Sequence, residues 1–236
     1  MPGDNAVGDF QRLLAAVKSA LAGAPAPLSH HHEATAGTLE SAAPDRGDLV
    51  SRLAHELELV RAAAIEAAST ADAADKIAAL ARRTGVRSAA VGDGVTVDLG
   101  AIAAALEQGG IEVVPLSRAD GDGPRSIRDR IARCDLGVAE ACHAIASSGT
   151  LAVVSDARNP GSLTLLPPLS VIVVRAARIV ADLVALLDAI GPAGVAANRL
   201  TLITGPSRTA DIEKRIVLGA HGPRELCAIV IRSADG

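Results

Sequence analysis

The sequence predicts an α/β fold in which an open, mostly parallel sheet is flanked by helices. From residue 85 onward, short apolar runs alternate with helical stretches, as in the strand–helix units that build parallel sheets. The runs are apolar at nearly every position, for example SVIVVRA at 170–176, which indicates strands buried on both faces. With 236 residues, 49% of them hydrophobic, the chain can bury such a core.

The N-terminal part of the chain differs from the rest. Residues 11–22 fit an amphipathic helix, whereas 23–47 are rich in proline, alanine, glycine and small polar residues, as in flexible linkers. Three adjacent histidines at 30–32 lie in this linker, but neighbouring loop histidines do not readily converge on one ion, so no metal site is predicted. We expect an N-terminal helix and flexible linker over 1–47, and one α/β domain over 48–236.

Two helices are expected at the start of the domain. In 48–69, apolar residues recur at helical spacing from Leu49 to Val60. In 70–85, Thr70 is placed to cap a second helix, and a glycine follows its end.

Strands and helices then alternate to the end of the chain. Strands are expected at 88–92, 111–116, 170–176, 199–205 and 226–232, and helices at 98–110, 123–134, 178–190 and from about 207 to 218. The segment 135–156 is expected to hold two short strands around a turn or a short helix. Because ligands of open parallel sheets bind beyond the carboxyl ends of strands, the turns that follow strands are the first places to search for a site.

The composition excludes several classes of function. One Phe and no Tyr or Trp leave nothing to stack on bases, and a net charge of −4 without a basic block argues against a nucleic-acid partner. Cys134, Cys142 and Cys227 lack CxxC spacing and number fewer than the four thiols an iron–sulfur cluster takes, so we expect no cofactor in this chain. No apolar run is long enough to span a membrane and no signal peptide is evident, which predicts a cytoplasmic protein.

The segment 205–223, GPSRTADIEKRIVLGAHGP, is the richest candidate site. The turn 205–209 is predicted to join the strand at 199–205 to a helix. Backbone N–H groups at a helix start are free and the helix dipole is positive there, so a strand-to-helix turn suits a small anion. The predicted anion-binding or substrate-binding residues are Gly205, Ser207, Arg208 and Thr209, with Arg208 able to bind bidentately.

An ordinary capped helix explains the same residues. Ser207 or Thr209 would serve as a cap without any ligand. Asp211 and Glu213 complement the helix dipole themselves and would repel an anion close by. His221 is either a proton shuttle, since imidazole titrates near neutrality, or the end of a loop. His221, Asp211 and Glu213 are thus the catalytic candidates, with roles that the sequence leaves open.

TGPSRTADIEKRIVLGAHGP also resembles the C-terminal signature of the LUD-domain family, in its lactate-utilisation protein C group. That signature reads S/T-G-P-S-x-T-x-D-I-E, then G-x-H-G-P, then an apolar strand. Upstream, HAIASSGTLAVVSD and the Leu-Leu-Pro at 165–167 are similar to the same family. The resemblance covers roughly residues 130–232, and a long gapped pattern on one framework is far more specific than a short motif.

One departure from the family lies in the turn SSGT, formed by Ser147, Ser148, Gly149 and Thr150. The family carries a glutamate where this chain has Ser147. The resemblance implies a fold similar to sugar-phosphate isomerases and coenzyme A transferases, some of which use a glutamate as covalent nucleophile. Without it, coenzyme A transfer is not expected. The four turn residues are kept as site candidates beside the alternative of a turn that only leads into a strand.

The resemblance implies a part in oxidising L-lactate to pyruvate, together with iron–sulfur partner proteins. The cysteine count fits a subunit without a cluster, a component of an L-lactate-oxidising complex rather than a complete enzyme. Two alternatives stay open. In the first, the chain is a stand-alone enzyme on a small carboxylate or phosphorylated substrate. In the second, it is a non-catalytic structural or docking subunit.

Overall fold

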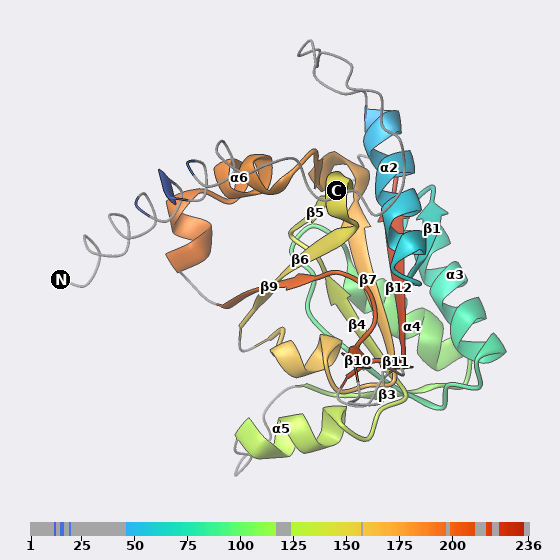
Figure 1. Ribbon diagram of the computed structural model, residues 1–236. Helices are drawn as coiled ribbons and strands as arrows, with labels where there is room; N and C mark the ends of the chain where they lie inside the picture. Colours follow the sequence, from blue (N-terminus) through green and yellow to red (C-terminus); the bar gives the residue numbers. More distant parts are fainter. Residues whose placement is uncertain are drawn as a thin grey trace.

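A computed structural model describes residues 46–116, 124–156, 158–196, 199–210, 216–218 and 222–233, together with Arg12, Ala15, Ala16 and Ser19, which are helical. Within these residues the chain forms a six-stranded sheet, a four-stranded sheet and a two-stranded hairpin, with helices around them (Figure 1). No helix among the described residues is long and apolar enough to cross a membrane.

The six-stranded sheet is parallel throughout. Its order is β1-β12-β7-β4-β2-β3, and its strands are β1 (Ala63–Ala67), β12 (Glu225–Ile231), β7 (Leu169–Arg175), β4 (Leu136–Glu140), β2 (Ser88–Val91) and β3 (Glu112–Val114). Its central strands β4, β7 and β12 are buried at nearly every position, as expected for strands covered on both faces. The open, mostly parallel α/β architecture predicted from the sequence is confirmed.

Side chains of the central strand β7 alternate between two apolar layers. Val171 and Val173 pack on the face covered by α3 (Thr70–Arg83) and α4 (Leu99–Gln108). Ile172 and Val174 pack on the opposite face, against α2 (Arg46–Leu59) and the four-stranded sheet. The period of two thus buries six of the seven positions of the strand. On this second face, α5 (Pro124–Ile131) covers β2.

The four-stranded sheet forms an additional layer. Its order is β8-β5-β6-β9, with strands β8 (Ile179–Val180), β5 (His143–Ile145), β6 (Thr150–Ser155) and β9 (Arg199–Ile203). Only β8 and β5 are parallel; β6 runs antiparallel to both β5 and β9. One face packs on α2 and the six-stranded sheet, and the other on α6 (Leu183–Ala196), which projects from the molecule (Figure 1).

The helix predicted over 48–69 is wrong in its second half. The helix α2 ends at Leu59, Arg61 adopts a positive φ of 61°, and 63–67 pair with β12 as the edge strand β1. Alanine-rich segments favour helices by local propensity, but pairing beside a buried strand overrides that preference. Similarly, the helix predicted over 178–190 begins only at Leu183, since Ile179 and Val180 pair with β5.

The helix predicted after residue 207 is also wrong. The strand at 199–205 lies in the four-stranded sheet, antiparallel to β6, and the turn after it leads into β10 (Arg208–Ala210). The strand β10 pairs antiparallel with β11 (Ile216–Leu218). Ile-Val-Leu fits a strand as well as one turn of an apolar helix face, and hairpin pairing decides between them.

Candidate functional site

The fold brings the two predicted site segments together. In the pairing of β6 with β9, Leu151 lies opposite Ile203, which places Thr150 beside Thr204. The two hydroxyl oxygens are 2.7 Å apart and share a hydrogen bond. The turn at 147–150 and the turn at 205–209, separated by more than fifty residues, therefore form one region.

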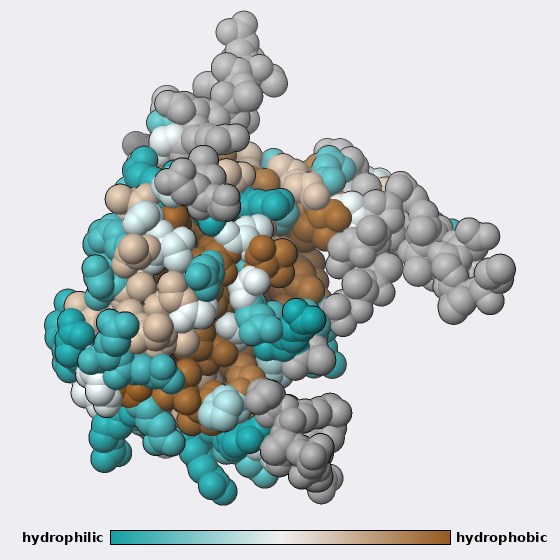
Figure 2. Space-filling model, turned by 180° about the vertical axis from the view of Figure 1, so that it is seen from behind, coloured by the Kyte–Doolittle hydropathy of each residue, from teal (hydrophilic) through white to brown (hydrophobic). Residues whose placement is uncertain are grey.

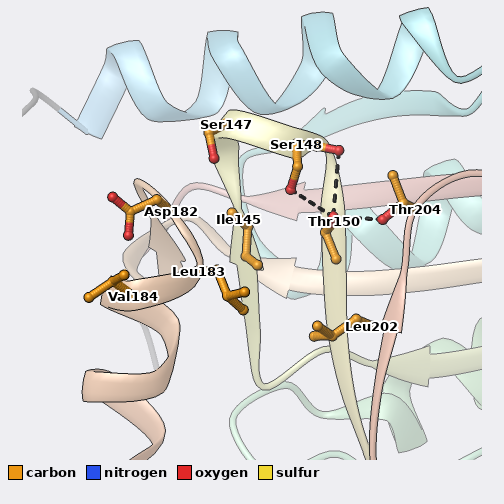
Figure 3. Close-up of a pocket in the computed structure, with 9 residues that line it drawn as sticks. All are labelled: Ile145, Ser147, Ser148, Thr150, Asp182, Leu183, Val184, Leu202 and Thr204. Carbon is orange, nitrogen blue, oxygen red and sulfur yellow. Dashed lines mark hydrogen bonds between the residues drawn. The ribbon is translucent and has the colours of Figure 1, made fainter. Parts of the chain in front are cut away.

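A chain of three hydroxyl groups runs through this region (Figure 3). Thr150 is 5% exposed, and its hydroxyl lies between those of Ser148, at 2.8 Å, and Thr204. Since each hydroxyl can donate one hydrogen bond and accept two, the outer members keep capacity for a further partner. Ser148 and Thr204 are the exposed ends of the chain.

These hydroxyls form one wall of a pocket of about 490 Å³. Its lining residues are Ile145, Ser147, Ser148, Thr150, Asp182, Leu183, Val184, Leu202 and Thr204 (Figure 3). The polar wall comes from the 147–150 turn and Thr204, and the apolar wall from β5, β9 and the start of α6. Apolar side chains also gather on the hollowed side of the molecule beside α6 (Figure 2). We call this cavity the hydroxyl pocket.

The turn that carries the hydroxyls is held against α2. Ala146–Ser148 form a single 3-10 turn, and Gly149 follows with a φ of 60°. A Cβ on Gly149 would lie 2.8 Å from the Glu56 carbonyl carbon and 2.9 Å from the Leu57 nitrogen. Only glycine combines the left-handed conformation with this close approach of two backbones. The conformation of the turn is therefore fixed by its contact with α2.

The turn after β9 is anchored in a similar way. Gly205 has a φ of 84° and lies against Val60 at the end of α2. The Ser207 N–H donates to the Pro223 carbonyl at 3.0 Å, which ties the turn to the start of β12. Gly205, Ser207 and Pro223 line a smaller cavity of about 270 Å³, which adjoins the hydroxyl pocket because Leu202 and Thr204 line both.

The helix-dipole argument for an anion at 205–209 does not hold, because a strand follows this turn. Gly205 and Ser207 are described. Of Arg208 and Thr209 the structure describes only the backbone, in β10. Asp211, Glu213 and His221 lie outside the described residues. Anion binding at this turn stays a prediction.

The hydroxyl pocket has little charge among its lining residues. Asp182 is the one ionisable residue there, and its carboxylate accepts from the Ala185 N–H at 2.8 Å at the start of α6. His143, close to Ser147 in sequence, lines a different cavity. No base in the described lining is placed to activate a serine, so the pocket's groups are suited to binding by hydrogen bonds.

Sequence reasoning missed Thr204, Asp182 and the apolar wall. Thr204 belongs to the quoted signature, directly before Gly205, and a hydroxyl next to a predicted turn was a usable signal. Asp182 and Leu183 carried no such signal, because the position of α6 follows from its packing on β5.

The three cysteines are free thiols. Burial raises the pKa of Cys134 to about 11 and that of Cys227 to about 12. Burial also raises the pKa of Cys142, whose thiol donates to the Ala152 carbonyl. All three stay protonated near neutral pH and are poor nucleophiles. Among the described residues no group of three His, Cys, Asp or Glu side chains is placed to hold a metal ion.

Comparison with known proteins points to one family. Residues 50–231 match the family model of the LUD domain. The chain is similar to lactate utilization protein C of Halalkalibacterium halodurans, with 29% identity over 114 residues, covering 47% of this chain and 49% of the relative. The corresponding protein of an Exiguobacterium species is 31% identical over 119 residues, covering 48% and 50%. The chain thus aligns with about half the length of these relatives.

A solved structure shares the fold. A DUF162 family protein from Deinococcus radiodurans superposes with a TM-score of 0.59 at 24% identity, over 80% of this chain and 99% of that one. The LUD model extends from α2 through β12 and so includes both sheets and both turns of the candidate site. This chain belongs to the LUD domain family.

Proposed function

We propose that this chain acts in lactate utilisation, as a subunit of a system that oxidises L-lactate to pyruvate. The observation that carries the proposal is the LUD domain match over 50–231, together with relatives named lactate utilization protein C. The role of those relatives is carried over as a proposal, because the alignments reach about half of their length.

The hydroxyl pocket supports a small amphiphilic ligand. Lactate has a methyl group at one end and a carboxylate and a hydroxyl at the other. The apolar wall with Leu183 and Leu202 suits the methyl group, and the outer hydroxyls of Ser148 and Thr204 suit the polar end. Arg208, at the start of β10 after the adjoining turn, would supply the cation for the carboxylate.

The electrons of the reaction imply partners. Oxidation of lactate to pyruvate releases two electrons and two protons, which an acceptor must take. The three cysteines of this chain are fewer than a four-thiolate cluster needs, and two of them are deeply buried. We therefore place the electron-accepting clusters in iron–sulfur partner proteins and assign no cofactor to this chain.

Growth on L-lactate tests the proposal. A strain deleted for this gene, and freed of any second lactate pathway, is complemented with wild type, Thr204→Val, Arg208→Ala or His221→Ala. Thr84→Val is the matched control, since its hydroxyl only bonds the carbonyls of Leu80 and Ala81 at the end of α3. Protein levels are compared by immunoblot so that instability is not mistaken for lost function.

We expect no growth of the deletion strain on lactate, normal growth on glucose, and rescue by wild type and Thr84→Val. Failure of Thr204→Val and Arg208→Ala to rescue would place the ligand at the hydroxyl pocket. Rescue by every variant would support lactate use but favour a docking subunit without a ligand at this pocket. Full growth of the deletion strain would refute the lactate assignment.

A further inference from the structure

A second cavity lies at the point in the parallel sheet where the chain reverses the direction in which it adds strands. From β2 the chain passes to β3 on one side and then returns to β4 on the other, so β2 and β4 flank a switch point. Ala89 of β2 packs under α3 and α4, whereas Ala90 packs under α5 on the opposite face. The loop after β2 leads to α4 on the first of these faces and the segment after β4 leads to β5 on the other, and ligands of open α/β sheets bind in the crevice at such a switch point.

The cavity at this point, which we call the switch-point pocket, measures about 300 Å³. Its lining residues are Asp93, Val95, Thr96, Glu140, Cys142, His143, Val154, Asp156, Asn159 and Arg178. None of them lines the hydroxyl pocket. The two cavities are distinct sites, and a volume of this size suits a small molecule.

His143 is the unusual member of the lining. It is 8% exposed, and its Nδ1 is buried without a hydrogen-bond partner among the described residues. Burial, and secondarily the positive charge of Arg178, lowers the pKa of its imidazole. The ring is thus neutral near pH 7, and a buried polar atom without a partner is costly unless a ligand or water completes it.

The carboxylates of the pocket are already engaged. Glu140 accepts from the backbone N–H groups of Val95 and Thr96 and from the Thr96 hydroxyl, and so fixes the loop after β2. Asp156 accepts from the N–H groups of Arg158 and Asn159 at 2.8 and 2.7 Å. Glu140 and Asp156 therefore hold the loops that line the pocket.

Asp93 lies 3.9 Å from the Arg158 guanidinium, as an exposed ion pair. Arg178, by contrast, has an exposed side chain and makes no hydrogen bond or ion pair with any residue that the structure describes. Arg178 directly precedes Ile179 of β8, and His143 directly precedes Ala144 of β5. Because Ile179 and Ala144 are paired, Arg178 and His143 lie at the same end of these two strands. Among the described residues, the pocket therefore combines a guanidinium without an ion-pair partner, that of Arg178, with a buried imidazole nitrogen, Nδ1 of His143, that has no hydrogen bond.

We propose that the switch-point pocket binds a small hydroxycarboxylate, with Arg178 pairing the carboxylate and His143 accepting a hydrogen bond from the hydroxyl. An arginine fork matches a carboxylate geometrically. The three surrounding carboxylates favour a singly charged ligand over a dianionic phosphate, because like charges repel. They also accept hydrogen bonds from further hydroxyl groups of a ligand.

This inference goes beyond the lactate proposal and stands without it, since it concerns a different cavity and a class of ligand. The test is a titration of the full chain, labelled at the histidine rings for NMR, with L-lactate, 3-hydroxypropionate, propionate and inorganic phosphate. Spectra of His143→Gln assign the His143 signal. Arg178→Gln, at an exposed position, tests the cation without disturbing the core.

Two matched controls test whether the effect is specific to Arg178. Arg158→Gln removes a neighbouring guanidinium that lies outside the pocket lining, and Thr84→Val removes a hydroxyl at the end of α3 that lines neither pocket. We expect a hydroxycarboxylate to shift the His143 signal and to bind more tightly than propionate, with affinity lowered about tenfold or more by Arg178→Gln. Both controls should bind as wild type does.

Three results would overturn the proposal. These are an unmoved His143 signal at tens of millimolar of every carboxylate, tighter binding of phosphate than of any carboxylate, or equal loss with Arg158→Gln. In His143→Gln the preference for lactate over propionate should disappear; a preference that persists would also contradict the assigned contact. Binding here combined with normal growth of the deletion strain on lactate would refute the lactate proposal alone.

Discussion

The six-stranded and the four-stranded sheet differ in how completely their strands are buried and in how much they contribute to the candidate pockets. In the six-stranded sheet, β7 and β12 each bury six of seven residues, and apolar layers cover both faces. In the four-stranded sheet, β9 has no fully buried residue, and the sheet carries Thr150 and His143. Both candidate pockets draw residues from this second sheet.

The difference follows from strand direction and cover. A parallel sheet is covered on both faces, which leaves few positions for polar side chains away from the strand ends. An antiparallel sheet can leave part of one face or edge open, and here the edge strand β9 and the turn before β6 do so. Substitutions in the first sheet should therefore change stability, and substitutions in the second should change binding.

The largest loss of stability is expected from Gly137→Ala in β4. A Cβ at this position would overlap the Leu163 carbonyl oxygen and lie 3.0 Å from Pro167. Because backbone and a proline ring cannot yield cheaply, we expect a loss of about 3 kcal/mol or more in the free energy of unfolding. Urea denaturation followed by circular dichroism measures it.

The matched control for this substitution is Gly100→Ala in α4. There the new Cβ meets only the Asp98 carboxylate, at 3.0 Å. Alanine also favours helix over glycine by up to about 1 kcal/mol, so the stability should be unchanged or higher. Equal losses at both positions would show that β4 accommodates an added methyl group as well as the surface of α4 does, which would contradict the close packing at Gly137.

Gly149→Ala tests the contact of the 147–150 turn with α2 and should have the next largest effect. The substitution combines a left-handed backbone with contact against the Glu56–Leu57 backbone, and we expect a loss of about 2–3 kcal/mol. Gly85→Ala is the control, since it has a φ of 73° but nothing within 4 Å of the new Cβ. Its loss should stay near 1 kcal/mol. Similar losses in both variants would remove the argument that α2 fixes this turn.

Whether a strand could be predicted from the sequence depends on the same difference in burial. The strands β7 and β12 were predictable because burial on both faces leaves an uninterrupted apolar run. The strands β5 and β8 have three and two residues, too few to show any period. The strand β1 and the β10–β11 hairpin carry sequences that fit helices equally well, and only their partners decide.

The candidate site divides in a comparable way. Residues in the two signatures, such as Gly149 and Gly205, were found from the sequence because each turn needs a special residue. The contact of Thr150 with Thr204 depends on the register of β6 and β9, and no local pattern specifies that pairing. The burial of His143 could not be predicted, because it depends on the pairing of β5 with β6 and β8.

Thr150→Val removes the central hydroxyl of the hydroxyl pocket with little change of shape. The exposed hydroxyls of Ser148 and Thr204 can turn to water, so we expect a loss of only about 1 kcal/mol in stability. Thr201→Val, on the edge strand β9 and outside the hydroxyl chain, should stay within about 0.5 kcal/mol. Thermal unfolding compares the two. A loss of several kcal/mol would mean that the hydroxyl chain is part of the core rather than a binding wall.

The smallest expected effect is a pH dependence from His143. Its pKa is lowered in the folded state, chiefly by burial, from an ordinary value of 6.5. The unfolded chain therefore binds this proton more readily, and stability is lost as the pH falls from 6.5 through the lower folded pKa. The loss cannot exceed about 1.4 kcal/mol per pH unit for one proton. His143→Gln should show a smaller loss than wild type in urea denaturation between about pH 7.5 and about pH 5.5. Equal slopes would mean that the imidazole has the same pKa in the folded and the unfolded chain and is therefore hydrated, which would contradict the burial of His143 in the switch-point pocket.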